Sequence, residues 1–198
     1  MSLIGKLIVR RFIQPAHDMR ASQFAELAPS PAEVVFIGDS ITAGGLWHEW
    51  FPEVSVANRG IDGDTTEGVL ARLSSAVAGA PARVFILIGT NDLSWKVSPD
   101  VIVGRVTQIL DGIRGASPAA EIFLQSVMPR NAKFHDRITD LNRRYRHLAQ
   151  EQHVTYLDLW PALADSDGAL TSHFTLDGLH LNGAGYRAWS AVLRPLVS

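Results

Sequence analysis

Short runs of consecutive apolar residues recur along the chain, and longer segments with a different periodicity separate them. Apolar residues at consecutive positions are typical of strands that are covered on both faces, as in a parallel sheet. The pattern therefore predicts buried strands in such a sheet. The predicted strands are Val34–Ile37, Val54–Ala57, Val84–Ile88, Ile122–Ser126 and Val154–Leu157.

The segments between these runs repeat apolar residues every three or four positions, which predicts amphipathic helices. Ser98 and Pro99 have the pattern of an N-cap followed by proline at the first helical position. Asn182 is predicted to cap the last helix. The residues expected to face inward are Val69, Leu70, Leu73 and Val77; Ile102, Val106, Ile109, Leu110 and Ile113; Ile138, Leu141, Tyr145 and Leu148; and Tyr186, Trp189, Leu193 and Leu196.

This alternation of strands and helices predicts an α/β fold, a three-layer α/β/α sandwich with right-handed crossovers. A length of 198 residues suits a single domain. We expect an N-terminal helical arm over residues 1–30 and one domain over residues 31–198. In the arm, Leu3, Ile4, Leu7 and Ile8 fit one face of a short helix. That face is interpreted as a packed arm or a contact in a homo-oligomer, with a peripheral membrane anchor as the alternative.

Composition narrows the class of protein. The formal net charge is -2 and no long basic run is present, so nucleic acid is not an expected partner. The absence of cysteine excludes disulfides and thiolate chemistry. Lys6, Arg10 and Arg11 interrupt the first apolar stretch, so it lacks the pattern of a secretory signal. We therefore expect a cytoplasmic protein without stable membrane insertion.

Glycine and polar residues follow three of the predicted strands. Gly38, Asp39 and Ser40 come after the first strand, and Asn58 and Gly60 lie at the end of the second. The segment Gly89-Thr90-Asn91-Asp92 follows the third. In a parallel sheet the carboxyl ends of the strands share one edge, which is where ligands bind. These segments are therefore expected to meet.

A long stretch without clear periodicity runs from Pro161 to Leu181 and contains Asp177 and His180, three residues apart. Long loops of this kind are often functional. Acyl transfer from an ester needs a nucleophile, a general base and a group that orients the base. Ser40 is the candidate nucleophile. His180 is the candidate base because imidazole exchanges protons near neutral pH, and Asp177 is the candidate orienting group.

Such chemistry also needs donors for the developing oxyanion. The candidates are the backbone N–H groups of Ser40 and Gly60 and the side-chain amide of Asn91. Glycine lets the backbone approach a ligand closely, and the asparagine amide carries two donors. Each residue also has a simpler interpretation: Ser40 as a helix cap, Gly60 and Asn91 as turn residues, Asp177 as an acid near a helix start, and His180 as a structural histidine.

Further side chains are candidates for a substrate pocket: Asp39, Trp47, Trp95 and Arg130. Trp95 is the first choice among the aromatic residues, and the alternative for these aromatics is the core. A solvated side chain is the alternative for Arg130. Thr65 or Asp64 is expected to cap the helix that follows.

A metal site is the competing interpretation of one cluster, because His173, Asp177 and His180 supply three potential zinc ligands. It would leave Ser40, Gly60 and Asn91 without a role. No G-x-x-x-x-G-K-[ST] phosphate loop is present. We therefore expect no metal and no cofactor.

Taken in order, Gly38-Asp39-Ser40, Gly60, Asn91 and Asp177-x-x-His180 resemble the SGNH hydrolase family, also called GDSL esterases and lipases. The stretch VVFIGDSIT resembles the branch of platelet-activating-factor acetylhydrolase catalytic subunits and bacterial acetylesterases. The resemblance implies a flavodoxin-like five-stranded sheet of order 2-1-3-4-5, no metal, and hydrolysis through an acyl-serine.

Substrate does not follow from the fold. The expectation is a serine esterase that acts on short acyl esters, preferentially acetyl, of an alcohol or sugar. The alternatives are a lipase, lysophospholipase or thioesterase for longer chains, an acyltransferase, and a catalytically silent carbohydrate-binding domain.

Overall fold

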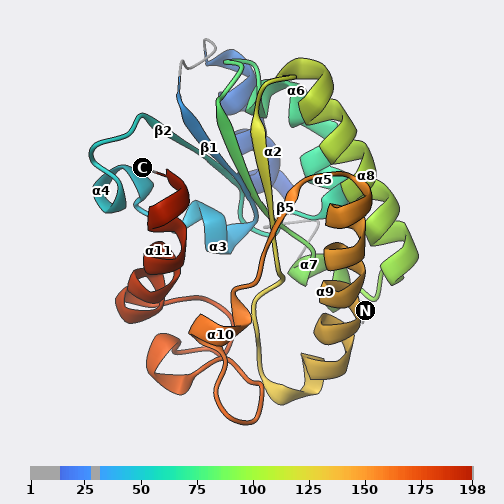
Figure 1. Ribbon diagram of the computed structural model, residues 1–198, viewed down its shortest axis with the longest axis vertical. Helices are drawn as coiled ribbons and strands as arrows, with labels where there is room; N and C mark the ends of the chain where they lie inside the picture. The colour runs from blue at the N-terminus through green and yellow to red at the C-terminus, as the bar shows by residue number, and fades with distance from the viewer. Residues whose placement is uncertain (1–13, 28–31, 198) are drawn as a thin grey trace.

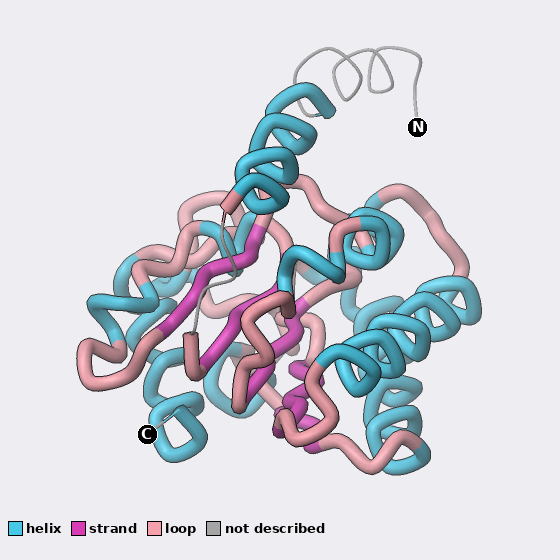
Figure 2. The backbone as a smooth tube through the Cα atoms, turned by 90° about the horizontal axis from the view of Figure 1, so that it is seen from above, coloured by secondary structure: helices cyan, strands magenta, loops and turns pink. Residues whose placement is uncertain are grey.

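The computed structural model describes residues 14–27 and 32–197. The first described element is helix α2, Gln14–Glu26, which forms the second half of the predicted N-terminal arm. Figure 2 shows this helix at the periphery of the molecule, projecting beyond the rest of the fold. The apolar face expected at Leu3 to Ile8 lies outside the described residues, so its role as an oligomer contact stays a prediction.

Five strands form one sheet within the described residues, in the order β2-β1-β3-β4-β5, and every pairing is parallel. This confirms the predicted topology. The observed bounds are β1 Val34–Gly38, β2 Val56–Gly60, β3 Arg83–Leu87, β4 Glu121–Gln125 and β5 Thr155–Leu157. The second strand starts two residues later than predicted, because the N–H of Val54 turns back to the carbonyl of Phe51 at 3.2 Å.

Helices cover both faces of this sheet (Figure 1). One face carries α5 Thr66–Ala71, α6 Leu73–Ala76, α8 Pro99–Ala116 and α9 His135–Glu151. The other carries α3 Ser40–Ala43, α4 Trp47–Trp50, α10 Trp160–Leu163 and α11 Gly183–Val197. Short helix α7, Thr90–Ser94, follows β3 directly, and two 3-10 turns cover Ala132–Phe134 and Ser172–Phe174.

The sequence patterns explain the two long helices of the first face. Ser98 caps α8, with its Oγ accepting from the N–H of Val101 at 3.5 Å, and Pro99 occupies the first turn. The apolar positions predicted to face inward on α8 and α9 are all buried: Ile102, Val106, Ile109, Leu110, Ile113, Ile138, Leu141, Tyr145 and Leu148. Burial of these apolar stripes against the strands is the main source of stability for this half of the molecule.

Two other segments differ from expectation. The helix predicted to run through Val69 and Val77 is divided at Arg72, where the backbone leaves helical geometry between α5 and α6. The stretch from Pro161 to Leu181 holds part of α10, a 3-10 turn and the isolated bridge Thr175 to Leu181. Among the helices of the described chain, none has the length and apolar character needed to cross a membrane.

Asn182 links the end of that stretch to α11. Its Oδ1 accepts from the N–H groups of Ala184 and Gly185 at 3.0 and 3.2 Å, and its Nδ2 donates to the carbonyl of His173 at 2.9 Å. The predicted cap is confirmed.

We expect Asn182→Ala to lower the free energy of unfolding by about 1 kcal/mol, because two N–H groups of the first turn lose their acceptor. Asn182→Asp keeps the acceptor for the first turn but loses the donor to the carbonyl of His173, so it should restore only the part of this stability that the cap supplies. Chemical denaturation of the three proteins measures the difference, and equal midpoints for wild type and Asn182→Ala would contradict it.

Candidate active site

Three side chains from distant parts of the chain form a continuous hydrogen-bonded row at the carboxyl edge of the sheet. Ser40 is the first residue of α3, and its Oγ lies 2.9 Å from Nε2 of His180, which is 140 residues away in sequence. Nδ1 of His180 lies 2.7 Å from Oδ2 of Asp177. This is the nucleophile, base and orienting carboxylate arrangement of acyl transfer. About half of the surface of the His180 and Asp177 side chains is exposed, so a substrate can reach the row.

The turn that carries Asp177 and His180 is held by its own backbone. Oδ1 of Asp177 accepts from the N–H groups of Leu179 and His180 at 2.9 and 2.8 Å. Gly178, the residue after Asp177, has the left-handed conformation at φ 74° that such a turn requires. The hydrogen bond to His180, helped by these backbone donors, holds the pKa of Asp177 far below its usual range. The carboxylate therefore stays ionised and fixes the orientation of the imidazole.

Ser40 is held by a tight strand-to-helix junction. Asp39 caps α3, and its Oδ1 accepts from the N–H of Ile41 at 2.9 Å. Gly38 leaves no room for a side chain, since a Cβ there would lie 2.3 Å from the carbonyl oxygen of Leu87. From the other side, the hydroxyl of Tyr186 on α11 donates to the carbonyl of Ile41 at 2.7 Å. These contacts fix the backbone on both sides of Ser40.

Gly60 does not have the free N–H that its predicted oxyanion role requires. Its N–H donates to Oδ1 of Asn58 at 2.9 Å, and Nδ2 of Asn58 lies 3.1 Å from each of the carbonyls of Thr42, Ala43 and Gly45. A Cβ on Gly60 would lie 2.3 Å from the N atom of Ala43. In this structure Gly60 therefore lets β2 pack closely against α3, and its N–H is already used.

Asn91 lies in the first turn of α7, directly after β3. Its Nδ2 donates to the backbone carbonyl of Asp64 at 2.9 Å, which leaves the second hydrogen of the amide for another acceptor. Gly63 directly precedes Asp64 and has φ 75°. Within the described residues its N–H makes no hydrogen bond. Sequence reasoning missed Gly63, although a glycine between Asp62 and Asp64 is itself a signal for a left-handed turn.

Comparison with known proteins agrees with this geometry. The family model described as the GDSL-like Lipase/Acylhydrolase family matches residues 36–188. This chain belongs to that family. It is accordingly a carboxylic ester hydrolase, and the predicted resemblance is confirmed.

Among its relatives, this acylhydrolase is 30% identical to the platelet-activating factor acetylhydrolase IB subunit alpha1 of Bos taurus, over 83% of this chain and 75% of that protein. It is 29% identical to the alpha2 subunit of Rattus norvegicus, over 83% of this chain and 74% of that protein. A GDSL-like lipase structure from Bacteroides thetaiotaomicron superimposes with a TM-score of 0.78 at 26% identity, covering 91% of this chain and 96% of the other. An acetylxylan esterase of Geobacillus stearothermophilus shares the fold, with a TM-score of 0.68, 20% identity, and coverage of 84% and 94%.

The remaining predicted pocket residues of the acylhydrolase have different surroundings. Trp47 is a core residue, 1% exposed and stacked on Phe36 at 4.2 Å, and therefore does not line an open pocket. Arg130 is bound to both ends of α7. Its Nη1 donates to Oγ of Ser94 at 2.8 Å and to the carbonyl and hydroxyl oxygens of Thr90. Trp95 is 40% exposed and lines a hollow that Gly63 and Asp64 also line.

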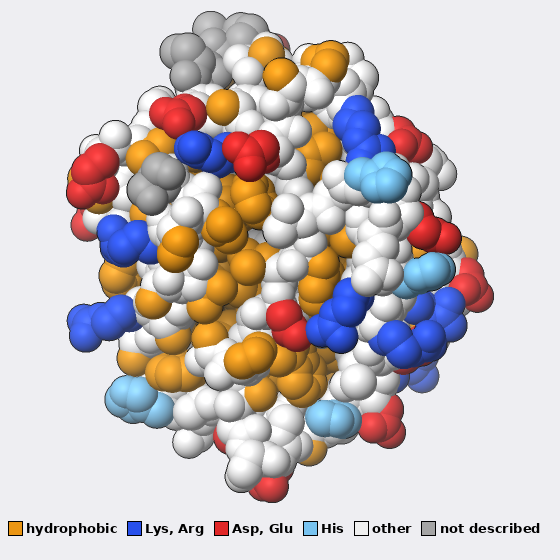
Figure 3. All heavy atoms as spheres, viewed as in Figure 1, with side chains coloured by type: hydrophobic (Ala, Val, Ile, Leu, Met, Phe, Trp, Pro, Cys, Tyr) orange, Lys and Arg blue, Asp and Glu red, His pale blue; other side chains and the backbone are white. Residues whose placement is uncertain are grey.

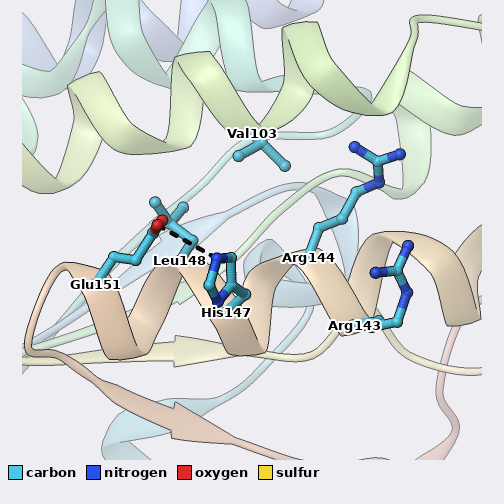
Figure 4. Close-up of a pocket in the computed structure, with 6 residues that line it drawn as sticks. All are labelled: Val103, Arg143, Arg144, His147, Leu148 and Glu151. Carbon is cyan, nitrogen blue, oxygen red and sulfur yellow. Dashed lines mark ion pairs between the residues drawn. The ribbon is translucent and has the colours of Figure 1, made fainter.

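A larger hollow lies away from this row, in the groove between α8 and α9 (Figure 4). Arg143 and Arg144 line this groove (Figure 4). Figure 3 shows several Lys and Arg side chains gathered on the side of the molecule where Figure 1 draws α9. Arg143 and Arg144 both pair with Asp140, and His147 pairs with Glu151. The groove thus has charges that are satisfied by neighbours, and the acyl-transfer row lies elsewhere. In the described part of the chain, no cluster of three or more His, Cys, Asp or Glu side chains is placed to hold a metal ion.

Asp39 is 1% exposed, and this burial raises its pKa from 3.8 to about 7. At a pH between these two pKa values, Asp39 is protonated in the folded protein and ionised in the unfolded chain. The contribution of Asp39 to the free energy of unfolding therefore falls as pH rises from about 4 to 7. Asp39→Asn keeps an acceptor for Ile41 and cannot ionise. We expect its free energy of unfolding relative to wild type to be higher at pH 8 than at pH 4.

Denaturant titrations at the two pH values test this expectation, with Asp111→Asn as an exposed carboxylate control on α8. A difference between wild type and Asp39→Asn that does not change with pH would show that burial does not govern the titration of Asp39.

Proposed function

We propose that this enzyme is a serine esterase that hydrolyses short acyl esters, preferentially acetyl, of an alcohol or sugar. The observation that carries the proposal is the row of Ser40, His180 and Asp177, joined by contacts of 2.9 and 2.7 Å. Ser40 is assigned as the nucleophile, His180 as the general base and Asp177 as the orienting carboxylate.

In the first half of the reaction, Oγ of Ser40 attacks the ester carbonyl carbon and its proton passes to Nε2 of His180. The tetrahedral intermediate collapses when the bond to the alkoxy oxygen breaks, and His180 returns the proton to that oxygen as the alcohol leaves. The acyl group is then bonded to Ser40.

In the second half, His180 takes a proton from water as the water oxygen attacks the acyl carbon. The bond to Oγ breaks, the proton returns to Ser40, and the carboxylic acid leaves. The balance is one ester and one water in, one acid and one alcohol out. The negative oxygen in both halves is assigned to the N–H groups of Ser40 and Gly63 and to Nδ2 of Asn91.

The packing around Asp39, the residue before Ser40, supports a short acyl group. Ile41, Leu87 and Met128 are each at most 3% exposed, and the hollow that they line with Asp39 is too narrow to admit a water molecule. A long hydrocarbon chain would have no room there without repacking of this core. The relatives named acetylhydrolases agree with this size limit.

Trp95 and Gln14 line a hollow of about 300 Å³ that Gly63, Asp64 and His17 also line. A half-exposed indole beside polar side chains suits one face of a sugar ring. This hollow is the assigned position of the alcohol.

We expect Asn91→Ala to lower kcat about 10²–10³-fold, because one oxyanion donor is lost. Steady-state hydrolysis of a nitrophenyl ester measures this, with Gln108→Ala on the exposed face of α8 as the matched amide control.

Ser40→Ala should abolish labelling by a fluorophosphonate probe. Full turnover in Asn91→Ala, or labelling that persists in Ser40→Ala, would contradict the assigned roles.

A chain-length series of nitrophenyl esters tests the acyl preference. The close packing around Asp39, next to Ser40, predicts that kcat/KM is highest for acetyl and falls steadily as the acyl chain lengthens. A maximum at eight carbons or more would instead indicate a lipase or thioesterase that uses the same residues.

A further inference from the structure

Helix α2 precedes the region matched by the family model and still reaches the active-site edge of the sheet. Nε2 of His17 on α2 lies 3.0 Å from Oδ1 of Asp64, 47 residues later in the chain. The carboxylate of Asp64 is 1% exposed and the His17 side chain is 17% exposed. A contact this deeply placed is screened little by solvent, so it fixes both partners more firmly than a surface ion pair would.

Asp64 is the centre of a hydrogen-bond network. Its Oδ1 also accepts from the N–H of Thr65 at 2.9 Å, and its Oδ2 accepts from Nε of Arg72 at 2.8 Å. Its backbone carbonyl accepts from Nδ2 of Asn91 at 2.9 Å. The residue whose side chain receives His17 is therefore the residue whose carbonyl positions the Asn91 amide.

The same network reaches the nucleophile. Nη2 of Arg72 donates to the carbonyl of Gly38 at 3.2 Å, two residues before Ser40. Gly68 makes the close packing possible, because a Cβ there would lie 2.0 Å from Oδ1 of Asp64 and 3.2 Å from Nε2 of His17. Asp64 thus connects α2 with two segments of the site, with Asn91 through its backbone carbonyl and with Gly38 through Arg72.

Helix α2 has a second anchor at Phe24, about two turns beyond His17. Phe24 is 7% exposed, with the guanidinium carbons of Arg59 and Arg72 at 5.0 and 5.9 Å from its ring centre. With Phe24 holding one end of the helix, His17 is presented to Asp64 at the other. The contact between His17 and Asp64 is therefore part of the packed structure and not an incidental surface contact.

We propose that His17 is a positioning residue of the esterase site, which acts through Asp64 to hold the Asn91 amide toward the oxyanion. The inference rests on the proposed function, because it takes Asn91 as an oxyanion donor. It assigns to α2, which lies outside the matched family region, a part in the rate of the chemical step.

The surroundings of His17 favour the form of its ring that donates from both nitrogens. Nδ1 faces Asp18 at 3.3 Å and Nε2 faces Asp64, while Arg72 is the cation on the far side of that carboxylate. The bond to Asp64 is the main reason that the pKa of His17 is raised, with burial and Arg72 opposing it. Donation to Asp64 is therefore the role for which this histidine is placed.

A double-mutant cycle tests the proposal. His17→Leu removes the donor, and we expect it to lower kcat roughly 10-fold with little change in KM, because a displaced oxyanion donor acts on the transition state. In the Asn91→Ala background, where that donor is already absent, the same change should have little further effect. His17→Gln offers an N–H to Asp64 and should restore much of kcat.

Met19→Ala, at an exposed position of the same helix, is the control and should leave kcat unchanged. Thermal unfolding of each variant separates a loss of positioning from a loss of folded protein.

Equal losses from His17→Leu in the two backgrounds would overturn the proposal, as would an unchanged kcat in the wild-type background. Either result leaves the assigned role of Asn91 intact if Asn91→Ala alone is impaired. A fully active Asn91→Ala single variant would instead overturn the donor role itself, and the inference about His17 with it.

Discussion

The parallel pairing of β1 with both β2 and β3 is the constraint on which the rest of the structure depends. It places Gly38 opposite Gly60 on one side and opposite Leu87 on the other. The chain segments that leave these three strands therefore start from neighbouring points of one edge. Ser40 follows the first, Asp64 the second and Asn91 the third, so residues from distant parts of the chain converge without any long-range covalent link.

Buried carboxylates give that edge its shape. Asp39 caps the helix that begins with Ser40, and Asp64 binds Arg72. Asp92 accepts from the N–H and the hydroxyl of Thr66 at 3.0 and 2.6 Å, which ties α7 to the start of α5. Burial opposes the ionisation of a carboxyl group, and partners offset the cost. Each of these carboxylates therefore holds one loop in a single conformation, which fixes the backbone next to Ser40 and Asn91.

The turn that carries Asp177 and His180 is held in a different way. Asp177 and His180 lie only three residues apart, and backbone N–H groups of the same turn bind the carboxylate. This turn is largely exposed, whereas the nucleophile rests on the buried sheet. Two side chains from the C-terminal part of the chain contact α3: the imidazole of His180 contacts Ser40, and the hydroxyl of Tyr186 donates to the carbonyl of Ile41. The hydrogen bond from Tyr186 thus ties α11 to the helix that begins with Ser40.

Sequence alone determined where the five buried strands lie along the chain and which faces of α8 and α9 are buried. It also determined the caps at Ser98 and Asn182, and it singled out Ser40, Asp177 and His180 as a group. These features are local, because apolar spacing, capping preference and turn chemistry depend on residues close in the chain. Motif order then implied the topology and the chemistry through resemblance to a family.

Only the tertiary structure decided which N–H groups are free, which indole is exposed, and what α2 touches. Gly60 and Gly63 are both glycines of one short segment, yet only packing against Asn58 shows that the first is occupied. Trp47 and Trp95 differ in exposure for the same reason. The contact of His17 with Asp64 joins residues 47 positions apart, and no local pattern encodes a distance of that kind.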